Sequence, residues 1–203
     1  MTETPKVRKI SVEGFYPSQN VIDVFVIGDF LNIGERVYLQ KTLDEADKTL
    51  RVDDRFRNND RVTLQEPVLA EKLFQRINDA VDLHNEEGFS PVGCNPRFHV
   101  YSYNEPGDQF TLHADQPYIR EDTISFYTVL IYLSDEYEGG EALIGGTAKF
   151  KPKAGTAIVF PHYILHGAAP LISGTRYTVR TDVMYRSTKL TQVHNLSRDE
   201  VLP

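Results

Sequence analysis

The sequence predicts an α+β protein in which supporting helices come first and a jelly-roll β-sandwich follows. Before residue 97 the signals are mainly helical, with a capping motif and a regularly spaced apolar face. After it, short runs rich in Val, Ile, Tyr, Phe and Thr are separated by turns that contain Gly or Pro. The 203 residues, of which 40% are hydrophobic and 25% charged, suit one globular domain over 1–203.

The N-terminal part, residues 1–96, is expected to hold one strand and two helices. Residues 21–27 are apolar and predict the strand, and Asn32 with Glu35 then forms a capping-box pattern for a helix that ends near residue 46. Residues 47–65 carry many charges without periodicity, which predicts a surface loop. A second helix begins at a proline, a residue suited to the first helical turn, and buries one apolar face: Pro67, then Leu69, Leu73, Ile77 and Val81, with Leu83 nearby.

The C-terminal half is expected to be all strand, followed by a polar tail over 187–203. The number of predicted strands is close to what a jelly roll requires. They cover residues 97–104, 109–115, 125–133, 141–150, 155–161, 163–168 and 175–186.

Charge and composition argue against several classes of protein. The formal net charge is −7 and no basic stripe offsets it, which disfavours a dedicated nucleic-acid binder. No apolar run approaches the roughly 18 residues that a membrane helix needs, and no apolar segment follows the basic residues near the N-terminus, so we expect neither a membrane span nor a secretory signal. Cys94 is the only cysteine, so a reducing compartment such as the cytoplasm is expected.

The chemistry is expected to centre on His113 and Asp115. Residues two apart in a strand point to the same face, so these two side chains can bind one metal ion. A third ligand must come from a later strand, and alternation does not separate His162 from His166. Arg176 lies ten residues after His166, across a turn, and its guanidinium would suit a carboxylate beside the metal, so this spacing favours His166.

This combination of residues resembles the iron(II)- and 2-oxoglutarate-dependent dioxygenases, in particular their prolyl 4-hydroxylase-like branch. The resemblance covers roughly residues 97–186 and implies that this segment is a double-stranded β-helix core. It implies the cofactors Fe(II), 2-oxoglutarate and O₂, with ascorbate as a further reductant. It also implies the site residues: His113, Asp115 and His166 on the iron, Arg176 on the distal carboxylate of 2-oxoglutarate, and Tyr103 and Thr128 as further contacts of this cosubstrate.

The resemblance implies hydroxylation of an unactivated C–H bond, with release of succinate and CO₂. The substrate would be a prolyl or other peptidyl side chain, or an amino-acid-like small molecule, with no membrane partner. One alternative is oxidative demethylation of a nucleic-acid base, but the second arginine expected six residues after Arg176 is replaced by Asp182. Another is a non-oxidative cupin-like metal protein or a jelly-roll binding module, but the His-x-His pattern with a nearby Glu is missing.

The last predicted strand has an apolar face and a charged face, and the charged face either meets water or lines a cavity. For Arg180, on that charged face, both a substrate contact and a structural ion pair stay open. His162 is expected in the core or beside the metal ligands rather than on the metal.

Overall fold

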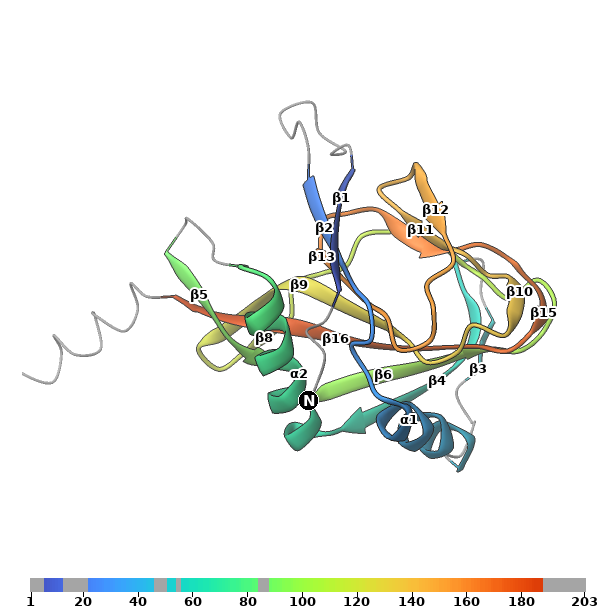
Figure 1. Cartoon of the computed structure of the whole chain (residues 1–203), viewed down its shortest axis with the longest axis horizontal. Coiled ribbons are helices and arrows are strands. Elements are labelled where there is room, and N and C mark those ends of the chain that lie inside the picture. The colour runs from blue at the N-terminus through green and yellow to red at the C-terminus, as the bar shows by residue number, and fades with distance from the viewer. Residues whose placement is uncertain (1–5, 13–21, 46–50, 54–55, 84–87, 188–203) are drawn as a thin grey trace, which may run out of the picture.

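Two antiparallel sheets and two helices form three layers in the computed structural model, which describes residues 6–12, 22–45, 51–53, 56–83 and 88–187. The helices α1 (Ile33–Glu45) and α2 (Pro67–Ala80) cover one face of the main sheet, and a smaller sheet lies over the other face (Figure 1). The prediction of helices first and a β-sandwich after them is therefore confirmed.

The main sheet has ten strands, and the longest of them, β16 (Arg176–Ser187), lies near its centre (Figure 1). Two short strands pair with central strands outside the main strand order: β5 (Phe89–Cys94) with β16, and β8 (Ile119–Arg120) with β9 (Thr123–Tyr132). The remaining order across the sheet is β1 (Val7–Val12), β2 (Ile22–Ile27), β13 (Ala157–Pro161), β9 (Thr123–Tyr132), β16, β6 (Arg97–Tyr103), β4 (Asn58–Gln65) and β3 (Arg51–Asp53).

The smaller sheet has four strands and carries two of the three predicted metal ligands. Its order is β12 (Ala148–Phe150), β11 (Ala142–Ile144), β14 (His166–Ala168) and β7 (Phe110–His113). A separate two-stranded ribbon pairs β10 (Tyr137–Gly139) with β15 (Leu171–Gly174). The predicted single strand 141–150 is in fact the hairpin β11–β12, because Gly145 and Gly146 adopt the positive φ values that a tight turn requires.

Helix α1 begins as the capping box predicts. The Glu35 backbone N–H donates to Asn32 Oδ1 at 2.9 Å, and the Asn32 backbone N–H donates to Glu35 Oε2 at 3.1 Å. The same Glu35 carboxylate receives two hydrogen bonds from the Arg76 guanidinium of α2, at 2.7 and 2.8 Å. The Glu35 carboxylate therefore both caps α1 and forms the ion pair that joins α1 to α2.

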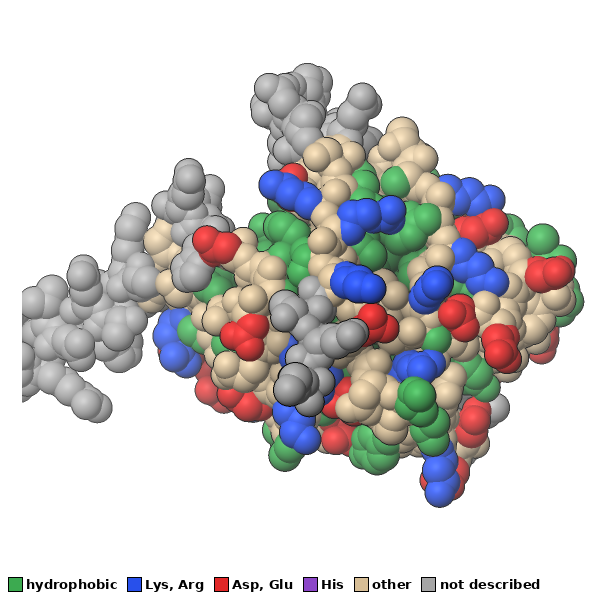
Figure 2. Space-filling view, viewed as in Figure 1, with side chains coloured by type: hydrophobic (Ala, Val, Ile, Leu, Met, Phe, Trp, Pro, Cys, Tyr) green, Lys and Arg blue, Asp and Glu red, His purple; other side chains and the backbone are tan. Residues whose placement is uncertain are grey.

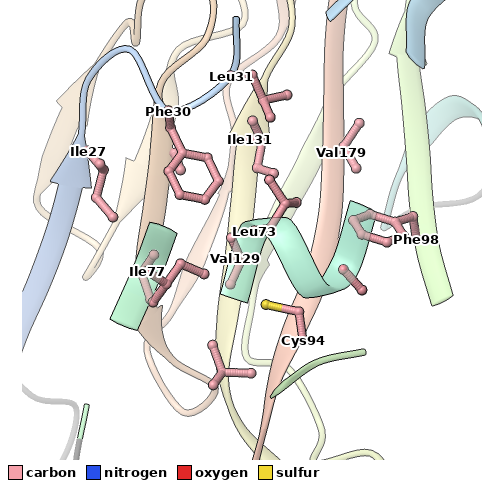
Figure 3. Close-up of a cluster of buried hydrophobic side chains, with 14 of the residues drawn as sticks. Ile27, Phe30, Leu31, Leu73, Ile77, Cys94, Phe98, Val129, Ile131 and Val179 are labelled. Carbon is pink, nitrogen blue, oxygen red and sulfur yellow. The ribbon is translucent and has the colours of Figure 1, made fainter. Parts of the chain in front are cut away.

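The main hydrophobic core lies between the helices and the outer face of the main sheet. Figure 3 shows Leu73 and Ile77 of α2 facing Val129, Ile131 and Val179 of the central strands. All five side chains are at most 1% exposed. The apolar spacing that predicted α2 is thus the spacing that buries it against the sheet.

The prediction of a surface loop over 47–65 is wrong where the structure describes this segment. Residues 51–53 and 58–65 are strands, and β4 pairs with β6 along its whole length. The charges misled because two charged residues of β4 are not on a solvated loop: Asp60 is buried and Arg61 lines a polar cavity. Five further strands, β1, β5, β8, β10 and β15, were not predicted. Ser187, the first residue of the predicted tail, belongs to β16, and the tail from residue 188 on lies outside the described residues.

The described helices are all too short or too polar to span a bilayer.

Candidate metal centre

The fold brings His113, Asp115 and His166 together. His113 of β7 and His166 of β14 lie directly opposite each other in the smaller sheet, and Asp115 follows two residues after His113. One ligand atom from each of the three lies within 4.8 Å of the other two, a separation that suits a shared metal ion. Among the described residues, this cluster contains His166 and does not contain His162, as the spacing to Arg176 predicted.

Both histidines are held in the tautomer that binds a metal through Nε2. His113 Nδ1 lies 2.8 Å from the Thr111 carbonyl oxygen, and His166 Nδ1 lies 3.0 Å from the Ile164 carbonyl oxygen. A carbonyl only accepts, so each Nδ1 carries the proton and each Nε2 keeps its lone pair. Burial lowers the pKa of His166 to about 4, so this imidazole is neutral at neutral pH.

Asp115 is fixed through both its backbone and its side chain. Its backbone N–H donates to the His162 carbonyl at 2.8 Å, and its Oδ2 lies 3.5 Å from His166 Nε2. The same Oδ2 is 3.2 Å from Arg180 Nε and accepts a hydrogen bond from Thr128 Oγ1 at 2.5 Å. Burial opposes ionisation of Asp115, but Arg180, then His166 and the Thr128 hydroxyl, outweigh it and hold its pKa below the usual value.

Behind Asp115 runs a directed chain of hydrogen bonds that the sequence did not reveal. Thr128 Oγ1 lies 2.8 Å from His162 Nδ1, and His162 Nε2 lies 2.8 Å from Ser125 Oγ. Ser125 Oγ accepts from the Tyr118 backbone N–H at 2.8 Å. Because the Thr128 hydroxyl gives its proton to Asp115, it accepts from His162 Nδ1–H, and Ser125 then donates to His162 Nε2.

This chain requires a neutral His162. Burial, followed by the nearby positive charge of Arg180, lowers the pKa of His162 to about 4, although Asp115 acts in the opposite direction. The structure therefore places His162 as a support of the metal ligands, in line with the expectation that it does not bind the metal itself. The Thr128 hydroxyl, predicted to contact the cosubstrate, is engaged with Asp115 and His162, and its role in cosubstrate binding stays a prediction.

Arg176 is buried in the same cavity without a carboxylate partner among the described residues. It is 2% exposed, and its guanidinium stacks over the rings of Tyr103 and Tyr132, with its central carbon 4.5 and 5.2 Å from their centroids. One nitrogen contacts the Tyr132 hydroxyl at 3.4 Å, whereas Nε and Nη1 have no hydrogen-bond partner. A buried cation with two unpartnered nitrogens is incomplete without an anion, so this end of the cavity fits a carboxylate.

The cavity has a volume of about 150 Å³ and contains more arginine than the sequence analysis assigned to it. Arg180 contacts Asp115 and also Asp182, with Nη2 3.0 Å from Asp182 Oδ1, so the structural ion pair is the contact that is observed. Arg57 and Arg61 line the same cavity and were not assigned a role. The six predicted site residues all line it: Tyr103, His113, Asp115, Thr128, His166 and Arg176.

The segment that contains the six predicted site residues matches a known protein family. Residues 97–181 match the model of the 2OG-Fe(II) oxygenase superfamily. This match confirms the resemblance to the iron(II)- and 2-oxoglutarate-dependent oxygenases.

A curated relative of this chain is a PKHD-type hydroxylase of Synechococcus sp. (strain CC9605), which is 32% identical over 83 residues. The alignment covers 38% of this chain and 37% of that protein, so the match spans a little over a third of the relative's length.

Solved structures share the fold of this chain. A prolyl-4-hydroxylase from Pseudomonas putida superposes with a TM-score of 0.58 at 18% identity, covering 81% of this chain and 92% of that one. A prolyl hydroxylase from Trichoplax adhaerens, in complex with a peptide fragment of hypoxia inducible factor, has a TM-score of 0.58 at 18% identity, covering 84% and 86%. The two facing antiparallel sheets are therefore the expected double-stranded β-helix.

Proposed function

We propose that this protein is an Fe(II)- and 2-oxoglutarate-dependent hydroxylase of an unactivated C–H bond. The observation that carries the proposal is the pairing, in one cavity, of the cluster His113, Asp115 and His166 with the buried and incompletely partnered Arg176. Two neutral imidazoles and one carboxylate are the donor set that Fe(II) oxygenases use, and they leave positions for exchangeable ligands. The family match supports the same reading.

Each residue has a distinct part in this proposal. His113, Asp115 and His166 would hold the iron, and Arg176 would bind the distal carboxylate of 2-oxoglutarate, with Tyr103 stacked against the guanidinium. Bound together, Fe(II) and 2-oxoglutarate supply the activation of O₂, with release of succinate and CO₂. The buried cavity wall keeps bulk water from these groups.

The proposed substrate is a prolyl or other peptidyl side chain, or an amino-acid-like small molecule. The PKHD-type relative and the two prolyl hydroxylase structures support a hydroxylase with a substrate of this kind. Ascorbate remains a prediction, as a reductant that would sustain turnover.

The experiment that tests the proposal is an anaerobic titration of the Fe(II)-loaded protein with 2-oxoglutarate. A weak visible charge-transfer band should appear as the cosubstrate chelates the iron, and no substrate is needed. Asp115→Ala and His166→Ala should lose the iron and the band, whereas Arg176→Ala should bind iron and require much more 2-oxoglutarate. Folded, iron-loaded protein without a band would refute the proposal, and iron retained by His166→Ala but lost by His162→Ala would refute the ligand assignment.

A further inference from the structure

Four arginines line the cavity described above, against one carboxylate, that of Asp115. Arg180 contacts Asp115 and Asp182, and Arg176 is assigned to 2-oxoglutarate. Arg57 and Arg61 have no role in the proposed function. The whole chain has a net charge of −7, and acidic and basic side chains are interspersed over the face shown in Figure 2. The concentration of positive charge is thus a property of the cavity rather than of the whole chain.

Arg61 points into the cavity because of its register in the main sheet. It pairs with Tyr101 of β6, which pairs with Thr178 of β16, and all three line the cavity. Its neighbour Val62 belongs to the opposite face and packs against the main hydrophobic core. Strand alternation therefore directs the Arg61 guanidinium inward, on the same face as Arg180.

The Arg61 side chain is not fully satisfied where it lies. Its Nε is buried and has no hydrogen-bond partner, and no carboxylate among the described residues forms an ion pair with it. An unpartnered buried N–H of a cation costs free energy that a bound anion would recover. The field at this wall is positive: burial, then Arg180 and Arg61, lower the pKa of the neighbouring His99 to about 4.

Arg57 extends the positive wall toward the metal cluster. Its guanidinium carbon lies 5.7 Å from the centre of the Phe110 ring, and that ring stacks on His113 with centroids 3.8 Å apart. Arg57 is thus one aromatic ring away from a metal ligand. It lies four residues from Arg61, roughly 13 Å along an extended chain, so the two arginines flank the space rather than clamp one group.

We propose that the primary substrate carries a free carboxylate and that Arg61 binds it, with Arg57 adding positive potential at the same wall. This inference rests on the proposed function and narrows its substrate class. A planar guanidinium pairs with a carboxylate through two parallel hydrogen bonds, which a neutral amide does not reproduce. The substrate is therefore an amino-acid-sized molecule, a chain terminus or an acidic side chain with a free carboxylate, and an internal peptide residue without an acidic side chain lacks the group that Arg61 binds.

The test uses matched probes on protein loaded anaerobically with Fe(II) and 2-oxoglutarate. Isothermal titration calorimetry compares N-acetyl-L-amino acids with their primary amides, which differ by one negative charge, and includes a Gly-Pro-Gly peptide blocked at both ends. The protein variants are Arg61→Gln, Arg61→Lys and, as a matched control, Arg8→Gln on the exposed edge strand β1. Melting temperatures confirm that each variant is folded.

At least one acid should bind, and its amide should bind about 10- to 100-fold more weakly, the range for a charge-assisted hydrogen-bonded pair. Arg61→Gln should abolish this preference, Arg61→Lys should restore part of it, and Arg8→Gln should leave it unchanged.

Four outcomes would overturn the inference: no acid binds, amides bind as tightly as acids, the blocked peptide binds most tightly, or Arg61→Gln loses the 2-oxoglutarate band. Failure of the proposed function gives a separate result, because the unsubstituted protein would then show no band before any probe is added.

Discussion

The two faces of the main sheet are built from the same strands but differ in chemistry. On the outer face, Val129, Ile131 and Val179 are completely buried against the helices. On the inner face, their neighbours Thr128 and Arg180 on the same strands contact the Asp115 carboxylate. Since successive side chains point to opposite faces, a strand can be half core and half active site. Burial of the apolar face stabilises the fold, and this stabilisation offsets the free-energy cost of burying charged side chains on the other face.

The inner face is stabilised by hydrogen bonds between its own polar groups. Most of its polar groups are satisfied by each other, as in the hydrogen-bond chain from Ser125 through His162 and Thr128 to Asp115. The exceptions include buried nitrogens of Arg61 and Arg176, both of which line the cavity. Satisfied polar groups hold the site in shape, and unsatisfied ones mark where ligands are expected.

The largest expected effect is a loss of stability caused by a substitution on the outer face, which should leave 2-oxoglutarate binding unchanged. Leu73→Ala removes a fully buried side chain of α2 and should lower the free energy of unfolding by about 2–5 kcal/mol, measured by urea denaturation. The 2-oxoglutarate band should persist in the folded variant, because Leu73 contacts only the outer face. Val68→Ala, at a 68% exposed position of the same helix, serves as the control and should change stability by less than about 0.5 kcal/mol. If Leu73→Ala and Val68→Ala lowered the free energy of unfolding equally, the assignment of Leu73 to the hydrophobic core would be wrong.

A smaller effect is expected within the inner face, at Thr128. Thr128→Val keeps the shape but removes the hydroxyl between Asp115 and His162, so the affinity for Fe(II) should fall about tenfold. Thr128→Ser keeps the hydroxyl and should retain most of the affinity. Anaerobic Fe(II) titration measures both. If Thr128→Ser lost as much Fe(II) affinity as Thr128→Val, the packing of the Thr128 methyl group, and not the hydrogen bond of its hydroxyl, would determine the affinity.

The smallest effect concerns the ion pair that joins the helices covering the outer face. The hydrogen bonds from Arg76 hold the pKa of Glu35 below its ordinary value of 4.5. Glu35 therefore stabilises the fold when ionised: its contribution is present above pH 4.5 and is lost as the pH falls through the lower folded-state pKa. Glu35→Gln should cost about 1 kcal/mol at pH 7, and the difference from the unsubstituted protein should vanish toward pH 3.

Urea denaturation across that pH range provides the measurement, with Glu45→Gln as the control. Glu45 lies on the same helix in an exposed pair with Lys41 and should contribute little at any pH. A pH-independent cost of Glu35→Gln would show that the packing of Glu35, and not its charge, is what matters.

Local patterns predicted much of this molecule. The Asn32–Glu35 capping box and the apolar face of α2 depend only on residues three or four apart, so both were predicted correctly. The charged segment 58–65 was misread, because Val62 and Leu64 alternate with polar residues only in its second half and the four residues before them are all polar or charged. The strands β1 and β5 depend on partners far along the chain and were also missed.

The sequence by itself determined the donor set of the site. The spacing of His113, Asp115, His166 and Arg176 is a one-dimensional property, and it named the three members of the cluster together with Arg176, whose binding of a carboxylate stays a prediction. Only the tertiary structure decided what surrounds them. Thr128, His162 and Ser125 support Asp115, and Arg61 faces the cavity, because strand pairing brings distant segments into register, and no local periodicity encodes which strands pair.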